Sequence, residues 1–272
     1  MKIWKNTSTL DGCDDGLQFT SSKRMADIAL LGSKSFDLNE FHRLKGIFRA
    51  GIGRDNVPEK EAQEKGIVVR FPSTQTTNII YDETSSFTCS IIFRMLYRNV
   101  GTLEPWIKEP RQQLSQKTLL LIGTGRIGSR VAQLMKPFIK VTTFDILNNK
   151  SYELKELMQV ADCVSIHIPK SRKNVSFISE EKLSWMKNGS VIINTSRGEI
   201  VDEDALYKEI QSNRLSSAFD VYWQEPYDGK LKEFHPKSFY MTPHIASTCH
   251  EFLSGCRSDL YQMIADITNK SS

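Results

Sequence analysis

Residues 117–145, which read KTLLLIGTGRIGSRVAQLMKPFIKVTTFD, decide the fold. The apolar run 118–122 has the length of a strand and stops at Gly123, where the turn GTGRIG begins. Apolar residues then recur with helical spacing, and a second apolar run, 141–144, ends at Asp145. A strand, a glycine turn, a helix and a second strand that ends in an acid predict a dinucleotide-binding unit. The alternative is a glycine turn that serves packing alone.

Each glycine of this turn has an expected role. Gly123 makes the tight turn, Gly125 lets the backbone approach a pyrophosphate, and Gly128 lets the helix pack on the strand. The phosphates are expected at the helix N-terminus, where free N–H groups favour anions. Asp145 is expected to bind the ribose hydroxyls and to repel a 2′-phosphate, so NAD is predicted and NADP is less favoured. Lys150 lies nearby and weakens this preference slightly.

Length and charge exclude several classes of function. A chain of 272 residues is long enough for two domains. The net charge of +4 is small, and basic residues are interspersed with acidic ones, so no nucleic-acid partner is predicted. No apolar run approaches the length of a membrane span, so no membrane partner is predicted either.

The cysteines and the N-terminus predict a cytoplasmic protein. The five cysteines are odd in number and form no CxxC pair, and the start, MKIWKNTSTLDG, does not read as a signal peptide. Reduced thiols are therefore expected. Cys249 and His250 lie near His244, but this spacing matches no common set of metal ligands, so no metal site is predicted.

Strands and helices alternate along the whole chain, which predicts an α/β fold with parallel sheets. In the first third we expect loops at 6–23 and 72–80, weak helical character at 36–44, and a helix at 82–97. The polar segment 99–116 marks a connection between units. The other elements expected are strands at 2–4, 26–31, 46–50, 67–71, 163–168, 190–194, 217–221 and 239–242, and helices at 58–65, 154–160, 180–186, 202–211 and 251–267.

Reactive residues gather at the predicted strand ends, where parallel sheets bind ligands. Arg197 precedes Gly198 and offers a planar fork suited to a carboxylate; the alternative is a surface arginine paired with Glu199 or Asp202. His244 can exchange a proton near neutral pH, as a carbonyl reduction requires. The alternative is a histidine that bonds to a backbone carbonyl. Glu225 is placed to hold the imidazole, or else it is a solvated loop residue.

Five separated motifs now point to a family. GTGRIG with Asp145, then HIP, NTSRGEIVDEDAL, FDVYWQEP and TPHIAS resemble, in this order, the NAD-dependent D-2-hydroxyacid dehydrogenases, which include 3-phosphoglycerate, glycerate and D-lactate dehydrogenases. The resemblance extends from about residue 48 to about residue 247. It implies a Rossmann doubly wound sheet at 94–247, and a smaller, shortened flavodoxin-like substrate domain at 1–93 that the C-terminal helix 248–272 completes.

The resemblance also implies roles for individual residues. Arg197 would hold the substrate carboxylate and carbonyl oxygen, His244 would be the acid/base, and Glu225 its partner. Substrate contacts are implied for Ala50, Gly51, Ile52, Gly53, Arg197 and His244. Cofactor contacts are implied for Gly123, Gly125, Arg126, Ile127, Gly128, Asp145, His167, Ile168, Pro169, Thr195, Ser196, Asp220 and His244, with Asp220 at the nicotinamide carboxamide.

The predicted reaction is hydride transfer between NAD(H) and C2 of a small anionic 2-hydroxy or 2-oxo acid. A homodimer is expected by analogy, although the segment 97–116, usually part of the dimer arm, looks short. Two alternatives are a catalytically idle NADH sensor that binds partners and a family enzyme with formate or phosphite as donor. Glu225 argues against formate. Arg49 and Arg54 flank the substrate loop; they either bind a phosphate or second carboxylate or are solvated charges.

Overall fold

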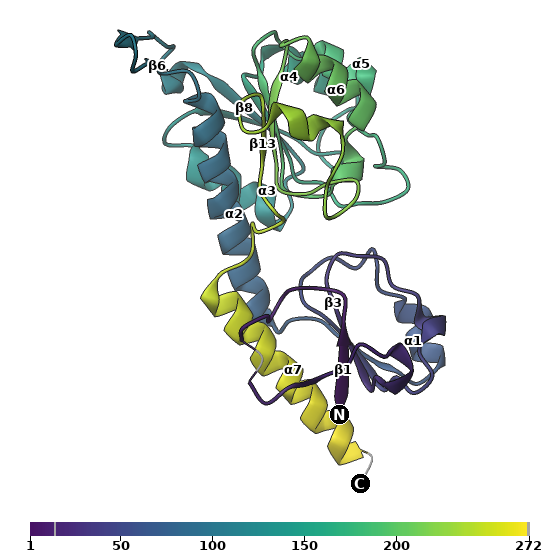
Figure 1. The fold of residues 1–272 in the computed structure, drawn as a ribbon. Coiled ribbons are helices and arrows are strands. Elements are labelled where there is room, and N and C mark those ends of the chain that lie inside the picture. Colours follow the sequence, from purple (N-terminus) through teal and green to yellow (C-terminus); the bar gives the residue numbers. More distant parts are fainter. Residues whose placement is uncertain (14, 271–272) are drawn as a thin grey trace. The chain divides into compact units, whose positions relative to one another are not determined.

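The computed structural model describes residues 1–13 and 15–270. By their contacts these residues form two compact units (Figure 1). The smaller unit contains residues 1–80 and the C-terminal segment from Ser247, and the larger contains residues 81–246. The long helix α2 (Thr74–Leu96) supplies residues to both, because the division falls within it.

The larger unit is built on a six-stranded sheet in which all neighbouring strands are parallel. The strand order is β13-β12-β11-β10-β8-β9. Strands are added on opposite sides of β8, so the topological switch point lies between β8 and β10, where α/β sheets bind dinucleotides. The predicted Rossmann architecture is confirmed. The strands are β8 (Thr118–Ile122), β9 (Lys140–Phe144), β10 (Cys163–Ile166), β11 (Val191–Asn194), β12 (Ser216–Phe219) and β13 (Phe239–Met241).

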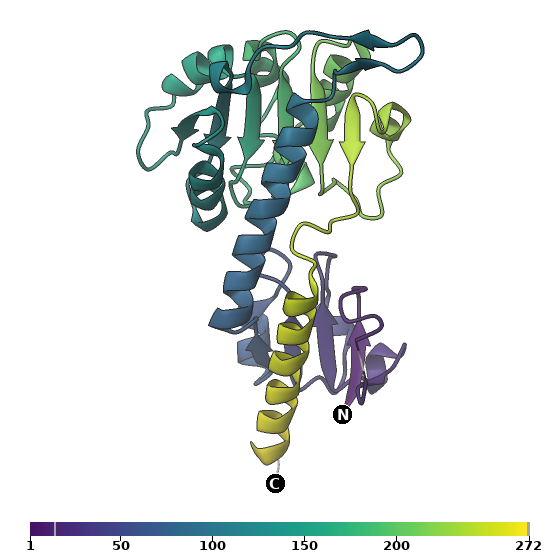
Figure 2. The same ribbon diagram turned by 90° about the vertical axis from the view of Figure 1, so that its left-hand side faces the viewer.

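Helices cover both faces of this sheet, which explains why its central strands β10, β11 and β12 are buried throughout. On one face lie α2 and α3 (Arg126–Met135), and Figure 2 shows α2 crossing the sheet. Ile92 of α2 and Val131 of α3 pack there against Leu121. The other face carries α4 (Glu153–Val160), α5 (Glu180–Trp185) and α6 (Glu203–Gln211). Two short segments of this unit, Gly198–Ile200 and Lys230–Phe234, are 3-10 helices.

The smaller unit has a five-stranded parallel sheet with the order β2-β1-β3-β4-β5, the flavodoxin-like arrangement. Helix α1 (Glu59–Glu64) packs on one face and α7 (His250–Lys270) on the other. Only 3-10 turns, Lys23–Met25 and Leu38–Glu40, precede β3 and β4 among the described residues, so the predicted shortening is confirmed. The strands are β1 (Lys2–Lys5), β2 (Gln18–Phe19), β3 (Ile28–Leu31), β4 (Gly46–Arg49) and β5 (Val68–Arg70).

Four local predictions are wrong. The segment 72–80 is helical from Thr74, because Thr76 donates to Asp259 of α7 at 2.8 Å and Ile80 is buried in the core. The expected loop 6–23 contains β2, and the helical character expected at 36–44 is limited to the 3-10 turn. The segment 99–116, predicted to connect the two units, lies within the larger unit and forms a hairpin of β6 (Gly101–Thr102) and β7 (Ile107–Lys108), followed by a 3-10 turn at Leu114–Gln116.

Within the described part of the chain, no helix is both long enough and apolar enough to cross a membrane.

Candidate active site

Every strand of the larger sheet is followed by a predicted site residue. Because the strands are parallel, their carboxyl ends lie along one edge of the sheet. In the order of the sheet, the residues at these ends are His244 after β13, Asp220 after β12, Thr195 after β11, His167 after β10, Gly123 after β8 and Asp145 after β9. The structure therefore gathers the predicted cofactor and catalytic residues of this unit at a single edge.

The turn between β8 and α3 requires its glycines. Gly123 has a φ of 97°, and a Cβ there would lie 2.6 Å from the carbonyl oxygen of His167. A Cβ on Gly128 would overlap the Gly123 carbonyl. Gly125 caps α3 and has nothing within 4 Å of its Cβ position, so its backbone is open to a ligand. This geometry fits a pyrophosphate at the helix N-terminus.

The next two residues differ in their surroundings. Arg126 begins α3 and is exposed, and its guanidinium lies 5.5 Å from the centre of the Tyr81 ring. Ile127 is half-buried and packs against the core beneath the turn. Of the two, Arg126 is therefore the one available to a phosphate.

Asp145 is held in place by the glycine turn itself. One of its carboxylate oxygens accepts hydrogen bonds from the Thr124 amide at 2.8 Å and the Thr124 hydroxyl at 2.9 Å. The other oxygen accepts from the Leu147 amide at 3.0 Å. The hydrogen bonds from the Thr124 and Leu147 amides lower the pKa of Asp145 below its usual range, so its carboxylate is charged at neutral pH.

The turns after β10 and β11 hold His167 and Thr195. Burial lowers the pKa of His167 to about 4, so its ring is neutral at neutral pH, and Nε2 lies 2.9 Å from the Ser165 hydroxyl. The Thr195 hydroxyl lies 2.9 Å from that of Thr88 in α2. Ile168 packs into the core, and the carbonyl of the exposed Pro169 accepts from Asn174 at 2.7 Å.

The turn that carries Arg197 is organised by Asn194, which is fully buried. The Asn194 amide donates to the carbonyl of Arg197 at 2.8 Å, and its oxygen accepts from the amide and hydroxyl of Ser196. The guanidinium of Arg197 donates to the Ser196 carbonyl at 2.7 Å. A Cβ on Gly198 would overlap the backbone of Tyr222 and Trp223, so only glycine lets this turn pack against the one after β12.

The acids considered as surface partners of Arg197 have other partners. Glu199 forms an ion pair with Lys170 at 2.6 Å. Asp202 caps α6 by accepting from the Ala205 amide at 2.9 Å. Each of these two acids therefore has a structural role of its own in this loop.

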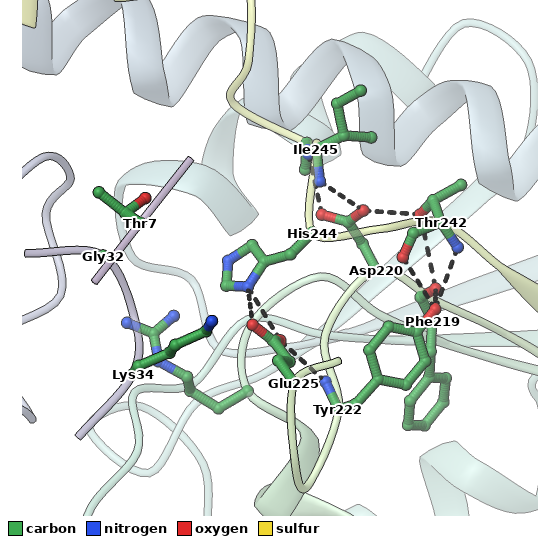
Figure 3. A network of polar contacts seen from close by, with 12 residues as sticks. Thr7, Gly32, Lys34, Phe219, Asp220, Tyr222, Glu225, Thr242, His244 and Ile245 are labelled. Carbon is green, nitrogen blue, oxygen red and sulfur yellow. Dashed lines mark hydrogen bonds and ion pairs between the residues drawn. The ribbon is translucent and has the colours of Figure 1, made fainter. Parts of the chain in front are cut away.

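His244 and Glu225 form a pair (Figure 3). Nδ1 of His244 lies 2.9 Å and 2.8 Å from the two carboxylate oxygens of Glu225. Glu225 also accepts from the Tyr222 amide at 3.2 Å. The His244 backbone has a φ of 53°, a left-handed conformation that is uncommon for a residue other than glycine. Such backbone strain is concentrated at functional sites.

Asp220 is completely buried beside this pair. Its carboxylate accepts from the Thr242 hydroxyl at 2.6 Å and from the amides of Ile245 and Ala246, each at 2.8 Å. Burial raises the pKa of Asp220 above its usual range, although these hydrogen bonds act in the opposite direction. Asp220 therefore fixes the turn that carries His244. Its predicted contact with a nicotinamide carboxamide stays a prediction.

The predicted substrate residues Ala50, Gly51, Ile52 and Gly53 follow β4 in the smaller unit. Gly51 has a φ of 144°, which favours glycine. Arg49 is buried and donates to the carbonyls of Leu31 and Ala50, so the view that it is a solvated charge is wrong. Arg54 pairs with Glu59 at 2.6 Å and covers the ring of Phe71. Substrate binding by this segment stays a prediction.

Three residues that contact the site residues were not predicted. Thr124 bonds to Asp145, Asn194 supports the Arg197 turn, and Tyr222 contacts both the Glu225 carboxylate and the backbone before His244. Each lies inside a motif that was recognised, so the signal was present. The contacts that reveal their roles join different strand ends and are visible only in three dimensions.

The larger unit of this chain matches a family of known proteins. Residues 97–246, more than half of the chain, match the family model described as the NAD-binding domain of D-isomer specific 2-hydroxyacid dehydrogenases. The chain belongs to this family. It is accordingly an NAD-dependent 2-hydroxyacid dehydrogenase, and NAD(H) is its cofactor. The open backbone at Gly125 and the charged Asp145 fit that cofactor.

Individual relatives agree with this assignment. The chain is 28% identical over 247 residues to a glyoxylate reductase of Korarchaeum cryptofilum, which covers 82% of this chain and 72% of that protein. It is 32% identical over 245 residues to a D-3-phosphoglycerate dehydrogenase of Synechocystis, and this match covers 83% of this chain and 43% of that protein. The solved structure of Aquifex aeolicus D-lactate dehydrogenase, complexed with NAD and lactic acid, superposes with a TM-score of 0.80 at 23% identity over 99% of this chain and 96% of that one, which shows the shared fold.

Proposed function

We propose that this protein uses NADH to reduce a small 2-oxo acid to a D-2-hydroxy acid, and that it catalyses the reverse oxidation. The observation that carries the proposal is the pair of His244 and Glu225, joined at 2.8 Å on the carboxyl edge of the larger sheet. His244 follows β13 and the glycine turn follows β8, so both lie on the edge of the sheet along which dinucleotides bind. The relatives bear the names of enzymes, so an idle NADH sensor is not favoured.

His244 acts as the acid/base in this proposal. Because Glu225 occupies Nδ1, that nitrogen carries the proton, and Nε2 is left to exchange a proton with the substrate. In reduction, protonated His244 donates from Nε2 to the oxygen at C2. In oxidation, neutral His244 accepts that proton, and Glu225 stabilises the positive ring that results.

Arg197 binds the acid. Its guanidinium offers a planar pair of donors, which matches a carboxylate and can also stabilise the negative charge that develops on the carbonyl oxygen. Asn194 and Gly198 set its turn in position. Bound NADH supplies the hydride. We assign its phosphates to the turn at Gly123–Gly128, its ribose to Asp145, and its nicotinamide end to the strand ends at Thr195 and Asp220.

NADH oxidation with a panel of 2-oxo acids tests this proposal. The panel is glyoxylate, hydroxypyruvate, pyruvate, phosphohydroxypyruvate and phenylpyruvate, assayed by loss of absorbance at the nicotinamide band. We expect at least one acid to be reduced, with the D-enantiomer as the product. Tight NADH binding without reduction of any acid would count against the proposal and would restore the sensor alternative.

Asp145 is expected to set the preference for NADH. Asp145→Asn removes the charge that repels a 2′-phosphate and replaces one of the two acceptor oxygens by an NH2 donor, so we expect the kcat/KM ratio of NADH to NADPH to fall by about tenfold or more, since a hydrogen bond to a charged group contributes about 1.5–3 kcal/mol. Steady-state kinetics with both cofactors measures the ratio. The control is Asp204→Asn, which removes an exposed carboxylate of α6 that pairs with Lys230. Equal ratios in the two variants would remove Asp145 from this role.

We also propose a cytoplasmic homodimer whose functional domains are residues 1–93 with 248–272, and 94–247. The hairpin β6–β7 supports the dimer, because it presents exposed apolar side chains: Val100 beside it, and Leu103, Trp106 and Ile107 within it. Such side chains on a monomer mark an interface. Light scattering of the wild type and of Trp106→Ser tests this, and a monomeric wild type would reject it.

A further inference from the structure

Tyr222 has a hydroxyl that contacts two strand ends at once (Figure 3). The side chain is buried, and its ring stacks on Tyr227 with centroids 5.0 Å apart. The hydroxyl lies 2.8 Å from the carbonyl oxygen of Phe219, at the end of β12, and 2.8 Å from that of Thr242, after β13. With one hydrogen it donates to one carbonyl at a time, and it accepts from the Thr242 amide at 3.0 Å.

The Thr242 backbone is the base of the turn that carries His244. The carbonyl of Thr242, one of the two acceptors of Tyr222, also accepts from the His244 amide at 3.0 Å. On the far side of His244, the amides of residues 245 and 246 donate to Asp220. The left-handed conformation of His244 is thus imposed by bonds on both sides, and one set of these bonds ends on the Tyr222 hydroxyl.

Tyr222 also holds the partner of His244. Its backbone amide donates to the Glu225 carboxylate at 3.2 Å, on an oxygen that lies 2.9 Å from Nδ1 of the imidazole. Tyr222 is therefore linked to both members of the pair: its amide donates directly to the Glu225 carboxylate, and its hydroxyl bonds to the Thr242 carbonyl that accepts from the His244 backbone amide. Burial raises the pKa of the Tyr222 phenol, so the hydroxyl keeps its proton at neutral pH.

We infer that Tyr222 is a positioning residue, whose hydroxyl sets the geometry of the His244–Glu225 pair by tying the Thr242 turn to the end of β12. This inference rests on the proposed acid/base role of His244. Removal of the hydroxyl leaves the ring packing intact but frees the turn to relax from its strained conformation. The imidazole then moves relative to Glu225 and to the substrate, and small displacements of a catalytic group slow the chemical step.

Tyr222→Phe tests the inference, with Tyr227→Phe as the matched control. The Tyr227 hydroxyl donates to Glu203 at 2.7 Å and accepts from the Leu231 amide, so its loss removes a hydroxyl from the same stacked pair without touching the His244 turn. We expect Tyr222→Phe to lower kcat about tenfold and to enlarge the solvent deuterium isotope effect on kcat, because proton transfer becomes slower. NADH affinity is expected to stay unchanged, and Tyr227→Phe to retain wild-type kcat.

A double-mutant cycle with Glu225→Gln separates positioning from general stability. If Tyr222 acts through the pair, the cost of Tyr222→Phe should largely disappear when Glu225 has already been replaced, because the two effects are then not additive. A Tyr222→Phe enzyme with normal kcat, a loss that is equal in Tyr227→Phe, or fully additive effects would each overturn the inference.

The variant His244→Asn, which lacks the proposed acid/base, is assayed beside these enzymes. Turnover retained by His244→Asn would reject the proposed acid/base itself. An inactive His244→Asn beside a fully active Tyr222→Phe would reject only the role of Tyr222.

Discussion

His244→Asn is expected to lower kcat by about 100- to 10,000-fold, the usual contribution of a general acid/base, while NADH affinity stays unchanged. Asparagine removes the imidazole but, unlike most residues, adopts a positive φ readily, so it fits the φ of 53° at this position. The turn should keep its bonds from residues 245 and 246 to Asp220. Stopped-flow and steady-state assays with the best acid of the panel measure kcat, and nicotinamide fluorescence measures binding.

His244→Ala provides the comparison. Alanine in a left-handed conformation adds about 1–2 kcal/mol of strain, so this variant should unfold at a lower temperature than His244→Asn although both lack the acid/base. Equal loss of kcat in the two variants would attribute the effect to the imidazole. If His244→Asn turned over normally, another group would have to supply the proton.

The sequence was sufficient to predict the framework of this molecule. The strand that leads to Gly123, β8, is apolar after Thr118 because helices cover both faces of its sheet, so it was recognisable as a short apolar run. The glycine spacing then predicted the turn, and the position of Asp145 at the end of β9 followed from it. Periodicity and turn chemistry are local properties, and local properties determined these elements.

What was missed depends on contacts between residues far apart in the chain. Helix α2 begins at Thr74 because Thr76 donates to Asp259. These two residues are 183 positions apart, so the threonine-rich segment alone could not predict the bond. Similarly, Asp220 was given a cofactor contact by resemblance, whereas its three bonds to the 242–246 segment tie β12 to the turn after β13. The left-handed backbone of His244 is a consequence of those bonds and has no local signature.

Arg197→Lys is expected to raise the KM for the 2-oxo acid by about tenfold or more and to lower kcat as well. Lysine keeps the positive charge but presents a point charge in place of a planar fork, so it cannot give two parallel hydrogen bonds to a carboxylate. The local structure should be retained, because Asn194 bonds to the backbone of residue 197 and Gly198 makes the packing contact. Steady-state kinetics in the acid, at saturating NADH, measures both constants.

Arg197→Ala extends this test to the role of the guanidinium itself. The loss of kcat/KM should be larger than in Arg197→Lys, and added guanidinium ion should restore part of it, because the deleted side chain leaves a space of matching shape and charge. NADH affinity should not change in either variant. A loss of NADH binding equal to the loss of kcat/KM would place Arg197 at the cofactor instead. An unchanged KM in both variants would show that Arg197 does not bind the substrate carboxylate. Other donors would then have to hold the acid on which His244 and Glu225 act.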